Sequence, residues 1–133
     1  MKGLFKITFL FLVVVTSEAL AQQQIMTGAA QAELYVRKLK GKKVGVVAHQ
    51  ASLVDSKTHL IDALLEAQIA VVKVFAPEHG FRGDADAGES VSDQKDIKTG
   101  LPILSLYGKN RKPAAESLQG IDLMLLDLQD VGV

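Results

Sequence analysis

Three ionisable side chains lie close together in the stretch F-A-P-E-H-G-F-R-G-D, which runs from Phe75 to Asp84. Glu78, His79 and Arg82 supply a carboxylic acid, an imidazole and a guanidinium directly after an apolar run. Pro77 disfavours helical backbone in the residue before it, so a strand ending there would project Glu78 and His79 beyond its carboxyl end. Such groups suit acid and base catalysis; the alternative is a solvated loop whose charges keep it soluble.

The neighbours of Glu78 favour proton donation. Phe75 and Phe81 flank it, and a carboxyl group packed against apolar side chains has a raised pKa, as a general acid needs near neutral pH. Arg82 would have the opposite effect if it paired with Glu78, or it could bind an anionic group of a substrate. The sequence leaves both roles of Arg82 open.

Polar residues also follow two other apolar runs. His49 comes directly after the run at 43–48, and Gln129 and Asp130 follow the run that ends in L-L-D-L. Asp127 lies inside that second run, where an unpaired carboxylate is costly. It therefore needs a partner, either structural or functional.

An alternation of strand and helix patterns is expected to position these groups. Short β-branched runs bounded by turn residues are typical of buried strands, and apolar stripes at spacings of three and four are typical of amphipathic helices. The pattern predicts an α/β fold with a Rossmann-like, doubly wound, mainly parallel sheet, which binds ligands beyond the carboxyl ends of its strands. The predicted strands are 43–48, 70–75, 101–106 and 121–128, and the predicted helices are 32–40, 58–67 and 113–118.

The helix predicted over 58–67 needs a residue that caps its first turn. Asp55 and Ser56 are of the right type to accept hydrogen bonds from the first N–H groups. His59 falls at the start of the same helix and is expected to be a surface or capping residue.

The amino-terminal residues are typical of an export signal. Lysines precede an apolar core at 7–15, and A-L-A at 19–21 resembles a cleavage site. The core is shorter than the roughly 20 residues that span a bilayer, so we expect no stable membrane span after cleavage, and a periplasmic or secreted protein. The predicted segments are a signal peptide at 1–21, a disordered lead-in at 22–31 and the Rossmann-like domain at 32–133.

Composition and motifs exclude several classes of function. The formal net charge is zero and the aromatic residues are two Tyr and five Phe, so no nucleic-acid partner is expected. The sequence has no Cys, no G-x-G-x-x-G after its first strand, no phosphate-binding G-x-x-x-x-G-K and no H-E-x-x-H. We therefore expect neither a nucleotide cofactor nor a metal site. Ser52 and Ser105 lack the turn that presents a nucleophilic serine.

Longer motifs resemble a known family. They are G-K-K-V-G-V-V-A-H-Q (41–50), P-E-H-G-F-R-G (77–83), T-G-L-P (99–102), S-L-Y-G (105–108), K-P (112–113) and I-D-L-M-L-L-D-L-Q-D-V-G-V (121–133). In order and spacing they are similar to the N-terminal domain of the bacterial exo-β-N-acetylmuramidases, which act in peptidoglycan recycling. The resemblance covers nearly all of the chain after residue 21.

The resemblance implies a glycosidase that acts on O-glycosyl bonds and releases terminal N-acetylmuramic acid from peptidoglycan fragments. It implies a cleft between this domain and a smaller C-terminal domain, which the sequence does not contain. Carried over by position, Glu78 is the candidate catalytic acid, and the candidate substrate-binding residues are His79, Arg82, His49, Gln129 and Asp130. His49 departs from the family pattern, which has Asn at this turn.

The second catalytic group is left open by the sequence. Asp127, Asp130, a residue of the missing domain and the substrate's own acetamido group are the alternatives, and retention or inversion depends on which one acts. An alternative function is a non-catalytic muropeptide-binding module, or an inert fragment.

Overall fold

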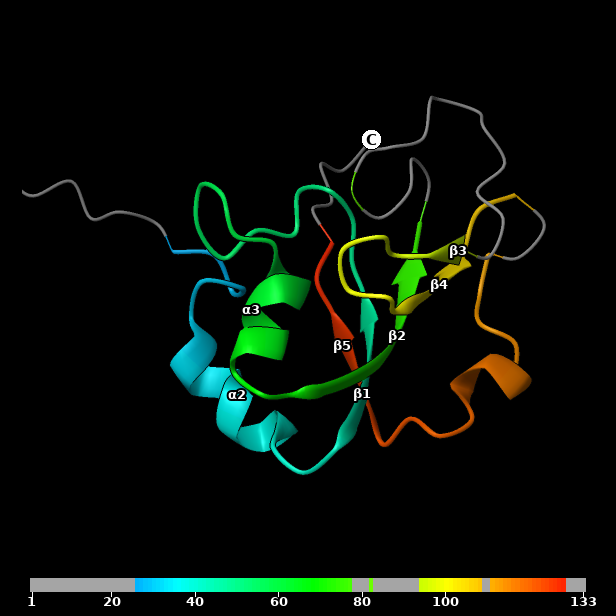
Figure 1. The fold of residues 1–133 in the computed structure, drawn as a ribbon, viewed down its shortest axis with the longest axis horizontal. Coiled ribbons are helices and arrows are strands. Elements are labelled where there is room, and N and C mark those ends of the chain that lie inside the picture. Colours follow the sequence, from blue (N-terminus) through cyan, green and yellow to red (C-terminus); the bar gives the residue numbers. More distant parts are fainter. Residues whose placement is uncertain (1–25, 78–81, 83–93, 109–110, 129–133) are drawn as a thin grey trace, which may run out of the picture.

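The computed structural model describes residues 26–77, 82, 94–108 and 111–128 of the chain. In this described part, five strands form one sheet with helical segments on both of its faces (Figure 1). The strands are β1 (Lys43–Val47), β2 (Ala70–Ala76), β3 (Gln94–Lys95), β4 (Pro102–Ser105) and β5 (Leu123–Leu126). The helices are α2 (Ala32–Leu39), α3 (Leu60–Glu66) and the 3₁₀ helix η1 (Glu116–Leu118).

The strand order β3-β4-β2-β1-β5 confirms the predicted α/β fold with a mainly parallel sheet. β1 runs parallel to β2 and β5, and β2 runs parallel to β4, whereas β3 is antiparallel to β4. The chain proceeds outward from β1 through β2 to β4 and then returns to place β5 on the other side of β1. This reversal makes the space between β1 and β5 the topological switch point, where sheets of this kind bind ligands.

One face of the sheet carries the main hydrophobic core. Val44 and Val46 of β1 lie in register with Val71 and Val74 of β2 and are buried against α2 and α3. The helices contribute their apolar stripes, and the residues involved are Leu39, Leu60, Ile61 and Leu64. The amphipathic pattern of the sequence was therefore a reliable guide to this layer.

The other face is covered by the segment that contains η1 (Figure 1). Fully buried Phe75 lies on this side, and the Nζ of Lys73 donates to the carbonyl oxygens of Ser117 (2.8 Å) and Gln119 (3.1 Å). These bonds satisfy carbonyl groups at the end of a short helix that has few internal partners. Lys73 thereby ties the η1 segment to the centre of the sheet.

The start of α3 differs from the prediction. Its N-cap is His59, whose ring accepts a hydrogen bond from the Ile61 N–H, and His59 is buried rather than at the surface. Asp55 does not cap the helix, because its carboxylate accepts from the N–H groups of Lys57 (2.8 Å) and Thr58 (2.7 Å) in the preceding turn. The capping role expected of His59 is confirmed, and the cap expected at Asp55 or Ser56 is wrong.

The bounds of several other elements also differ from the prediction. The helix predicted at 113–118 is only the 3₁₀ helix η1, the two later strands are shorter than predicted, and β3 was not predicted. Residues 28–30 form a turn with Ala29 buried, so the described end of the expected lead-in packs on the domain. The signal predicted at 1–21 lies outside the described residues. None of the helices in the described part has the length and apolar character to cross a membrane.

Candidate functional site at the sheet switch point

The predicted site residues follow three strands that are neighbours in the sheet. Glu78 and His79 come after β2, His49 comes after β1, and the Gln129-Asp130 pair comes after β5. β2, β1 and β5 are parallel and adjacent, so their carboxyl ends share one edge of the sheet. Of these residues only His49 is among the described ones, and the positions of the other four lie outside them.

The chain after β1 is tied to the chain after β5 through Ser52. The buried Ser52 hydroxyl donates to the carbonyl oxygen of Asp127 (2.8 Å) and accepts from the backbone N–H of His49 (3.1 Å). Its oxygen also lies 3.4 Å from Nδ1 of the half-buried His49 ring. Ser52 is therefore a structural link across the switch point, in agreement with the absence of a nucleophile motif around it.

His59, the N-cap of α3, contacts the turn after β1 that contains His49 and Ser52. Its two hydrogen bonds define its tautomer. Nδ1 accepts from the Ile61 N–H (3.2 Å), so Nε2 carries the proton and donates to the carbonyl oxygen of His49 (2.9 Å). Burial lowers the pKa of His59, because the charged ring would lose its hydration. The neutral Nε2–H form thus joins the first turn of α3 to the carboxyl end of β1.

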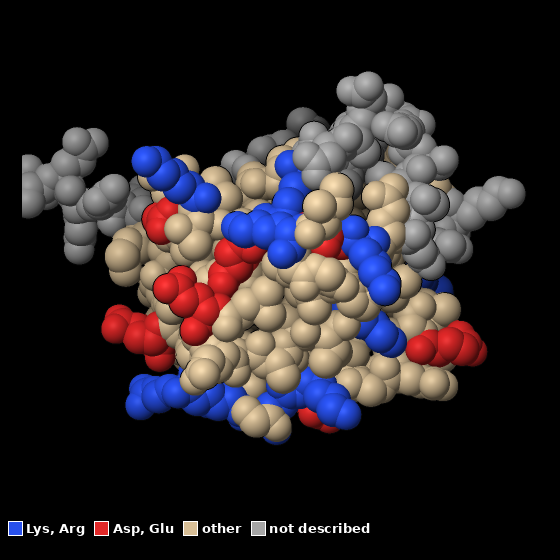
Figure 2. All heavy atoms as spheres, viewed as in Figure 1, with Lys and Arg blue, Asp and Glu red and all other residues tan. Residues whose placement is uncertain are grey.

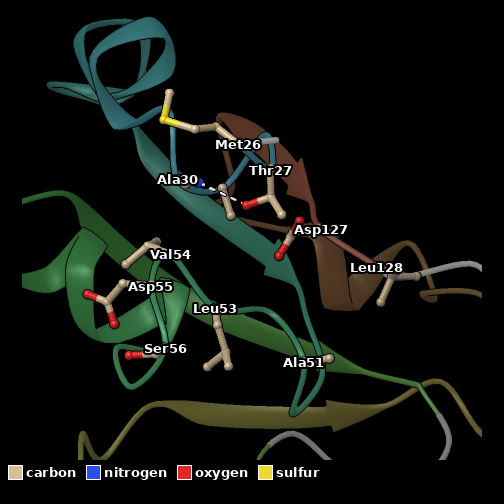
Figure 3. A pocket seen from close by; sticks show the side chains of 11 residues that line it. Met26, Thr27, Ala30, Ala51, Leu53, Val54, Asp55, Ser56, Asp127 and Leu128 are labelled. Carbon is tan, nitrogen blue, oxygen red and sulfur yellow. Dashed lines mark hydrogen bonds between the residues drawn. The ribbon is translucent and has the colours of Figure 1, made fainter. Parts of the chain in front are cut away.

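A cavity of about 780 Å³ opens beside the switch point. Figure 3 shows Met26, Thr27 and Ala30 on one side of it, the loop that carries Leu53 and Val54 on another, and Asp127 pointing into the space between them. Its lining mixes apolar side chains with a few polar groups, as small-molecule sites commonly do. The residues at its edge are Ala29, Ala51, Asp55, Ser56 and Leu128.

Asp127 is the acidic group of this cavity. Its backbone N–H donates to the carbonyl oxygen of Val47 (3.0 Å), which extends the pairing of β1 and β5. Among the described residues its half-buried carboxylate makes no hydrogen bond or ion pair. Burial, and next the negative charge of Asp127, raise the pKa of Tyr35. The partner expected for Asp127 is therefore not found in the described part of the chain.

Arg82 lies between two carboxylates in an ion-pair cluster that we call the Arg82 clasp, formed by Arg82, Asp62, Asp96 and Lys98. Nε and one terminal nitrogen of Arg82 donate to Asp96 at 2.8 and 2.9 Å. Its terminal nitrogens also donate to Asp62 at 3.0 and 3.3 Å. The Nζ of Lys98 contacts the same Asp62 carboxylate at 2.6 Å.

Each carboxylate of the clasp comes from a different element. Asp62 lies in the first turn of α3, and Asp96 begins the turn of the β3–β4 hairpin. Thr99 orients Asp96 by donating its N–H (3.2 Å) and its hydroxyl (2.5 Å), and the hairpin closes through the Gly100 N–H and the Asp96 carbonyl oxygen (2.7 Å). Gly100 has a φ of 72°, which glycine adopts without strain.

Each charged group of the clasp favours the charged form of its partners, which shifts their pKa values. The hydrogen bonds from Arg82, opposed in part by burial, lower the pKa of Asp96 to about 2. Burial alone would raise the pKa of Asp62, but the hydrogen bonds and positive charges of Arg82 and Lys98 outweigh it and lower this pKa. The pKa of Arg82 is raised above its ordinary value, chiefly by its hydrogen bond to Asp96. Figure 2 shows basic and acidic side chains side by side on the face of the molecule that carries α3.

The sequence analysis did not identify the clasp. Asp62 and Asp96 are far apart in sequence, and only the packing of α3 beside the hairpin brings them to the same guanidinium. The pattern D-x-x-T-G at 96–100, typical of a turn in which Asp orients the backbone, was the available signal. In the described part of the chain, no group of three or more His, Cys, Asp or Glu side chains is arranged to hold a metal ion.

Taken together, the mainly parallel sheet and the cavity beside its switch point define a doubly wound α/β protein, a class that commonly binds ligands beyond the carboxyl ends of its strands. The family is shown by comparison with known proteins: residues 44–133 match the model of the N-terminal region of the exo-β-N-acetylmuramidase NamZ. The chain belongs to this family.

Individual relatives agree. The chain is 44% identical over 99 residues to the peptidoglycan β-N-acetylmuramidase NamZ of Bacillus subtilis (strain 168), covering 74% of this chain and 24% of that protein. Two solved structures of DUF1343 family proteins from Bacteroides fragilis NCTC 9343 are also similar. One has a TM-score of 0.65 at 40% identity and covers 76% of this chain and 25% of that one. The other has a TM-score of 0.67 at 38% identity and covers 82% of this chain and 27% of that one. The chain thus spans about a quarter of the length of these relatives.

Proposed function

We propose that the protein is an exo-acting β-N-acetylmuramidase, a glycosidase that releases terminal N-acetylmuramic acid from peptidoglycan fragments. Family membership and the 44% identity to a peptidoglycan β-N-acetylmuramidase support this reaction. The observation that supports assigning this reaction to particular residues is the strand order. β2, β1 and β5 lie side by side, and each precedes predicted site residues in the sequence.

In this proposal Glu78 donates a proton to the glycosidic oxygen as the bond to the departing sugar breaks. β2 ends at Ala76 and is followed by Pro77, as the sequence predicts, so Glu78 follows the strand end by two residues. Phe75 is fully buried on the η1 side of the sheet and is committed to the core. The apolar surroundings that would raise the pKa of Glu78 remain a prediction.

His79, His49, Gln129 and Asp130 are proposed to contact the substrate from the ends of the same three strands. For His49 the described contacts are compatible with this role, because its turn is held by Ser52 and His59 through backbone groups. Nδ1 of its ring also lies 3.4 Å from the Ser52 hydroxyl oxygen.

The second carboxylate of the proposed reaction has one described candidate. The Asp127 side chain faces the cavity at the switch point, and its carboxylate makes no hydrogen bond or ion pair with the described residues. Asp130, a residue beyond this chain and the acetamido group of the substrate are the other candidates. Retaining and inverting enzymes differ in the distance between the two groups, about 5 to 5.5 Å against about 6.5 to 9.5 Å.

We further propose that residues 1–21 direct export, which would place the protein in the periplasm or outside the cell, where peptidoglycan fragments arise. Cleavage after Ala21 is the expected event. Mass spectrometry of the protein recovered from its own cells tests it, and a mature protein that keeps Met1 would contradict it.

Binding without cleavage is a second candidate function, favoured by the cavity beside the switch point, whose lining mixes apolar side chains with a few polar groups. The two functions are separated by incubating the protein, as its gene encodes it, with a short glycan that ends in N-acetylmuramic acid. Release of the terminal sugar supports the glycosidase. Calorimetric binding without release would support the binding module, and neither signal at millimolar ligand would contradict both.

A further inference from the structure

Two cavities of the described fold meet at Asp127. The larger one, of about 780 Å³, is the cavity beside the switch point, and a neighbouring one of about 240 Å³ is lined by Tyr35, Leu60 and Leu125. Ala29 and Asp127 line both of them. Figure 3 shows the Asp127 side chain directed into the larger cavity. Its carboxylate therefore borders a space of the size that small-molecule sites have.

The polar side chains around Asp127 direct their hydrogen bonds elsewhere. The Ser52 hydroxyl donates to the Asp127 carbonyl oxygen and not to its carboxylate. The Tyr35 hydroxyl donates to the carbonyl oxygen of Ala29 (2.7 Å), and Oγ1 of Thr27 accepts from a backbone N–H of its own turn (3.3 Å). Within the described ranges the half-buried carboxylate has no hydrogen-bond or ion-pair partner. Burial without such a partner costs free energy, so a purely structural role does not explain this side chain.

The larger cavity is acidic. Among its described lining residues none is Lys, Arg or His, and the two charged ones are Asp55 and Asp127. The Asp55 carboxylate already accepts from the N–H groups of Lys57 and Thr58. A ligand group that binds at Asp127 is therefore a hydrogen-bond donor or a cation, because an anion would be repelled.

Apolar side chains form most of the remaining wall of the cavity. They are Met26, Leu53, Val54 and Leu128, together with three alanines. An apolar group that contacts them is removed from water, which favours binding. A ligand that fits this wall and the carboxylate carries a donor next to an apolar part.

The geometry points to an N-acyl subsite: we propose that this cavity receives the acylamino group of an amino sugar, with its N–H donated to Asp127 and its alkyl part packed against the apolar wall. The identity of the sugar rests on the proposed function. On N-acetylmuramic acid the hydroxyls lack an apolar part and the lactyl group carries an anion, so the acetamido group alone has both features. Asp127 is thus a specificity-determining residue and not the second catalytic carboxylate.

Asp127→Ala should fold with undiminished stability. The carboxylate that it removes makes no bond with the described residues, and residues kept for ligand binding commonly reduce stability. The midpoint of urea unfolding, measured on the protein as its gene encodes it, should equal or exceed that of the wild type. A lowered midpoint together with unchanged sugar binding would show a structural aspartate and overturn the proposal.

The affinities for N-acetylglucosamine and glucose test the donor contact, because these sugars differ in the acetamido group and carry no lactyl carboxylate. In NMR titrations of the wild type we expect N-acetylglucosamine to shift the amide signals of residues 27, 54 and 127 and to bind at least about 10-fold tighter than glucose. In Asp127→Ala this preference should fall below about 3-fold. Asp127→Asn keeps an acceptor oxygen and should be intermediate, which also serves if the Ala variant does not fold. Equal affinity of the wild type for both sugars would overturn the proposal.

Glu116→Ala is the matched control for the loss of a carboxylate. Glu116 is an exposed acid in the first turn of η1 and does not line either cavity. Its variant should bind both sugars like the wild type. The same loss of preference in Glu116→Ala would show an effect of net charge and contradict the assignment to Asp127.

The size of the cavity predicts the effect of a longer acyl chain. A volume of about 780 Å³ exceeds what an acetyl group fills, so N-propionylglucosamine should also fit. Burial of its additional methylene should tighten binding about 2- to 4-fold in the wild type, and by a smaller factor in Val54→Thr, which keeps the shape but adds a hydroxyl. Weaker binding of the propionyl than of the acetyl sugar by the wild type would contradict the subsite.

Failure of this inference and failure of the proposed function are distinguishable. Binding of N-acetylglucosamine through Asp127 without release of N-acetylmuramic acid from a glycan would support the subsite and contradict the glycosidase. If the sugar is released, we expect Asp127→Asn to raise KM about 3- to 10-fold and to keep kcat within about 3-fold. A kcat lowered about 100-fold with unchanged affinity for N-acetylglucosamine would make Asp127 the second catalytic carboxylate and overturn the inference.

Discussion

At the scale of single residues, His59 joins two parts of the site that are distant in sequence. It caps α3 through Nδ1 and holds the turn after β1 through Nε2. We expect His59→Ala to lower the free energy of unfolding by about 1 to 3 kcal/mol, because it removes a helix cap and leaves the buried carbonyl oxygen of His49 without this donor. Urea unfolding followed by circular dichroism measures the change.

A matched substitution separates these two contributions. In His59→Asn the shorter side chain retains the ability to cap the helix but not to reach the His49 carbonyl, so its stability should lie between the other two proteins. An Ala variant as stable as the wild type would contradict the assigned role of His59.

Asp96 makes a prediction about acid stability. Its pKa in the folded protein is about 2, below the ordinary value of 3.8. The charged form is thus favoured by folding, so its contribution is fully present above about pH 4 and is lost as the pH falls from 3.8 towards 2. The groups around it are Arg82, Thr99, Asp62 and Lys98, with His59 close enough for its pKa to respond to Asp96.

The measurement is the midpoint of urea unfolding between pH 6 and pH 2.5 for the wild-type protein and Asp96→Asn. We expect the variant to be less stable at pH 6 and the difference to shrink by about 1 to 2 kcal/mol at pH 2.5, because Asp96 is then mainly protonated in the unfolded chain and still mainly charged in the folded protein. Comparison of the two proteins removes the contribution of Asp55, which lies outside the clasp. An equal difference at both pH values would contradict the lowered pKa.

At the scale of elements, the contact of β1 with the chain around β5 depends on the absence of a side chain at Gly45. A Cβ atom there would lie 2.6 Å from Sδ of Met124 and 2.8 Å from Cδ1 of Ile121. We expect Gly45→Val to cost about 1 to 3 kcal/mol of unfolding free energy, since the neighbours must move or the strands separate. Gly28→Val is a useful comparison, because nothing lies within 4 Å of a Cβ atom at that position.

The cause of the Gly45 effect can be checked by relieving the contact. Met124→Ala in the Gly45→Val background should restore part of the lost stability, because it removes the nearer neighbour. If the two substitutions were simply additive, the steric explanation would be wrong.

The strands and helices of the core were predictable because their side chains report burial directly. The β-branched run of β1 and the apolar stripe of α3 each show the period of their element. The short strand β3 has only Gln94 and Lys95, both exposed, so it has no apolar pattern to recognise. The η1 segment depends on the Lys73 side chain, a contact across more than forty residues that no local pattern contains.

The location of the candidate site could be predicted from the sequence, but the side-chain contacts around it could not. That polar residues should follow the strand ends could be deduced from the strand pattern, and the observed order of β2, β1 and β5 supports it. The bond from His59 to the His49 carbonyl oxygen and the two carboxylates on Arg82 could not be deduced, because each depends on groups brought together by tertiary packing. The sequence thus shows which residues are charged, but not which residues they pair with in the fold.

At the scale of the whole molecule, the chain belongs to the N-terminal muramidase family, and the three adjacent strands β2, β1 and β5 precede the proposed active-site residues in the sequence. In the described part of the chain, the clasp joins Arg82 to α3 and the hairpin, and the Ser52 link joins the chain after β1 to Asp127 after β5. The proposed function assigns the role of proton donor to Glu78, which follows β2 in the sequence.

The most direct test of this account is the rate at which the protein, Glu78→Gln and Glu66→Gln release N-acetylmuramic acid from a short glycan. Glu66 is exposed at the end of α3 and serves as the matched control. We predict that Glu78→Gln lowers kcat about 100-fold or more and that Glu66→Gln changes it less than 2-fold, because only the former removes a general acid. Wild-type kcat in Glu78→Gln would contradict the central claim.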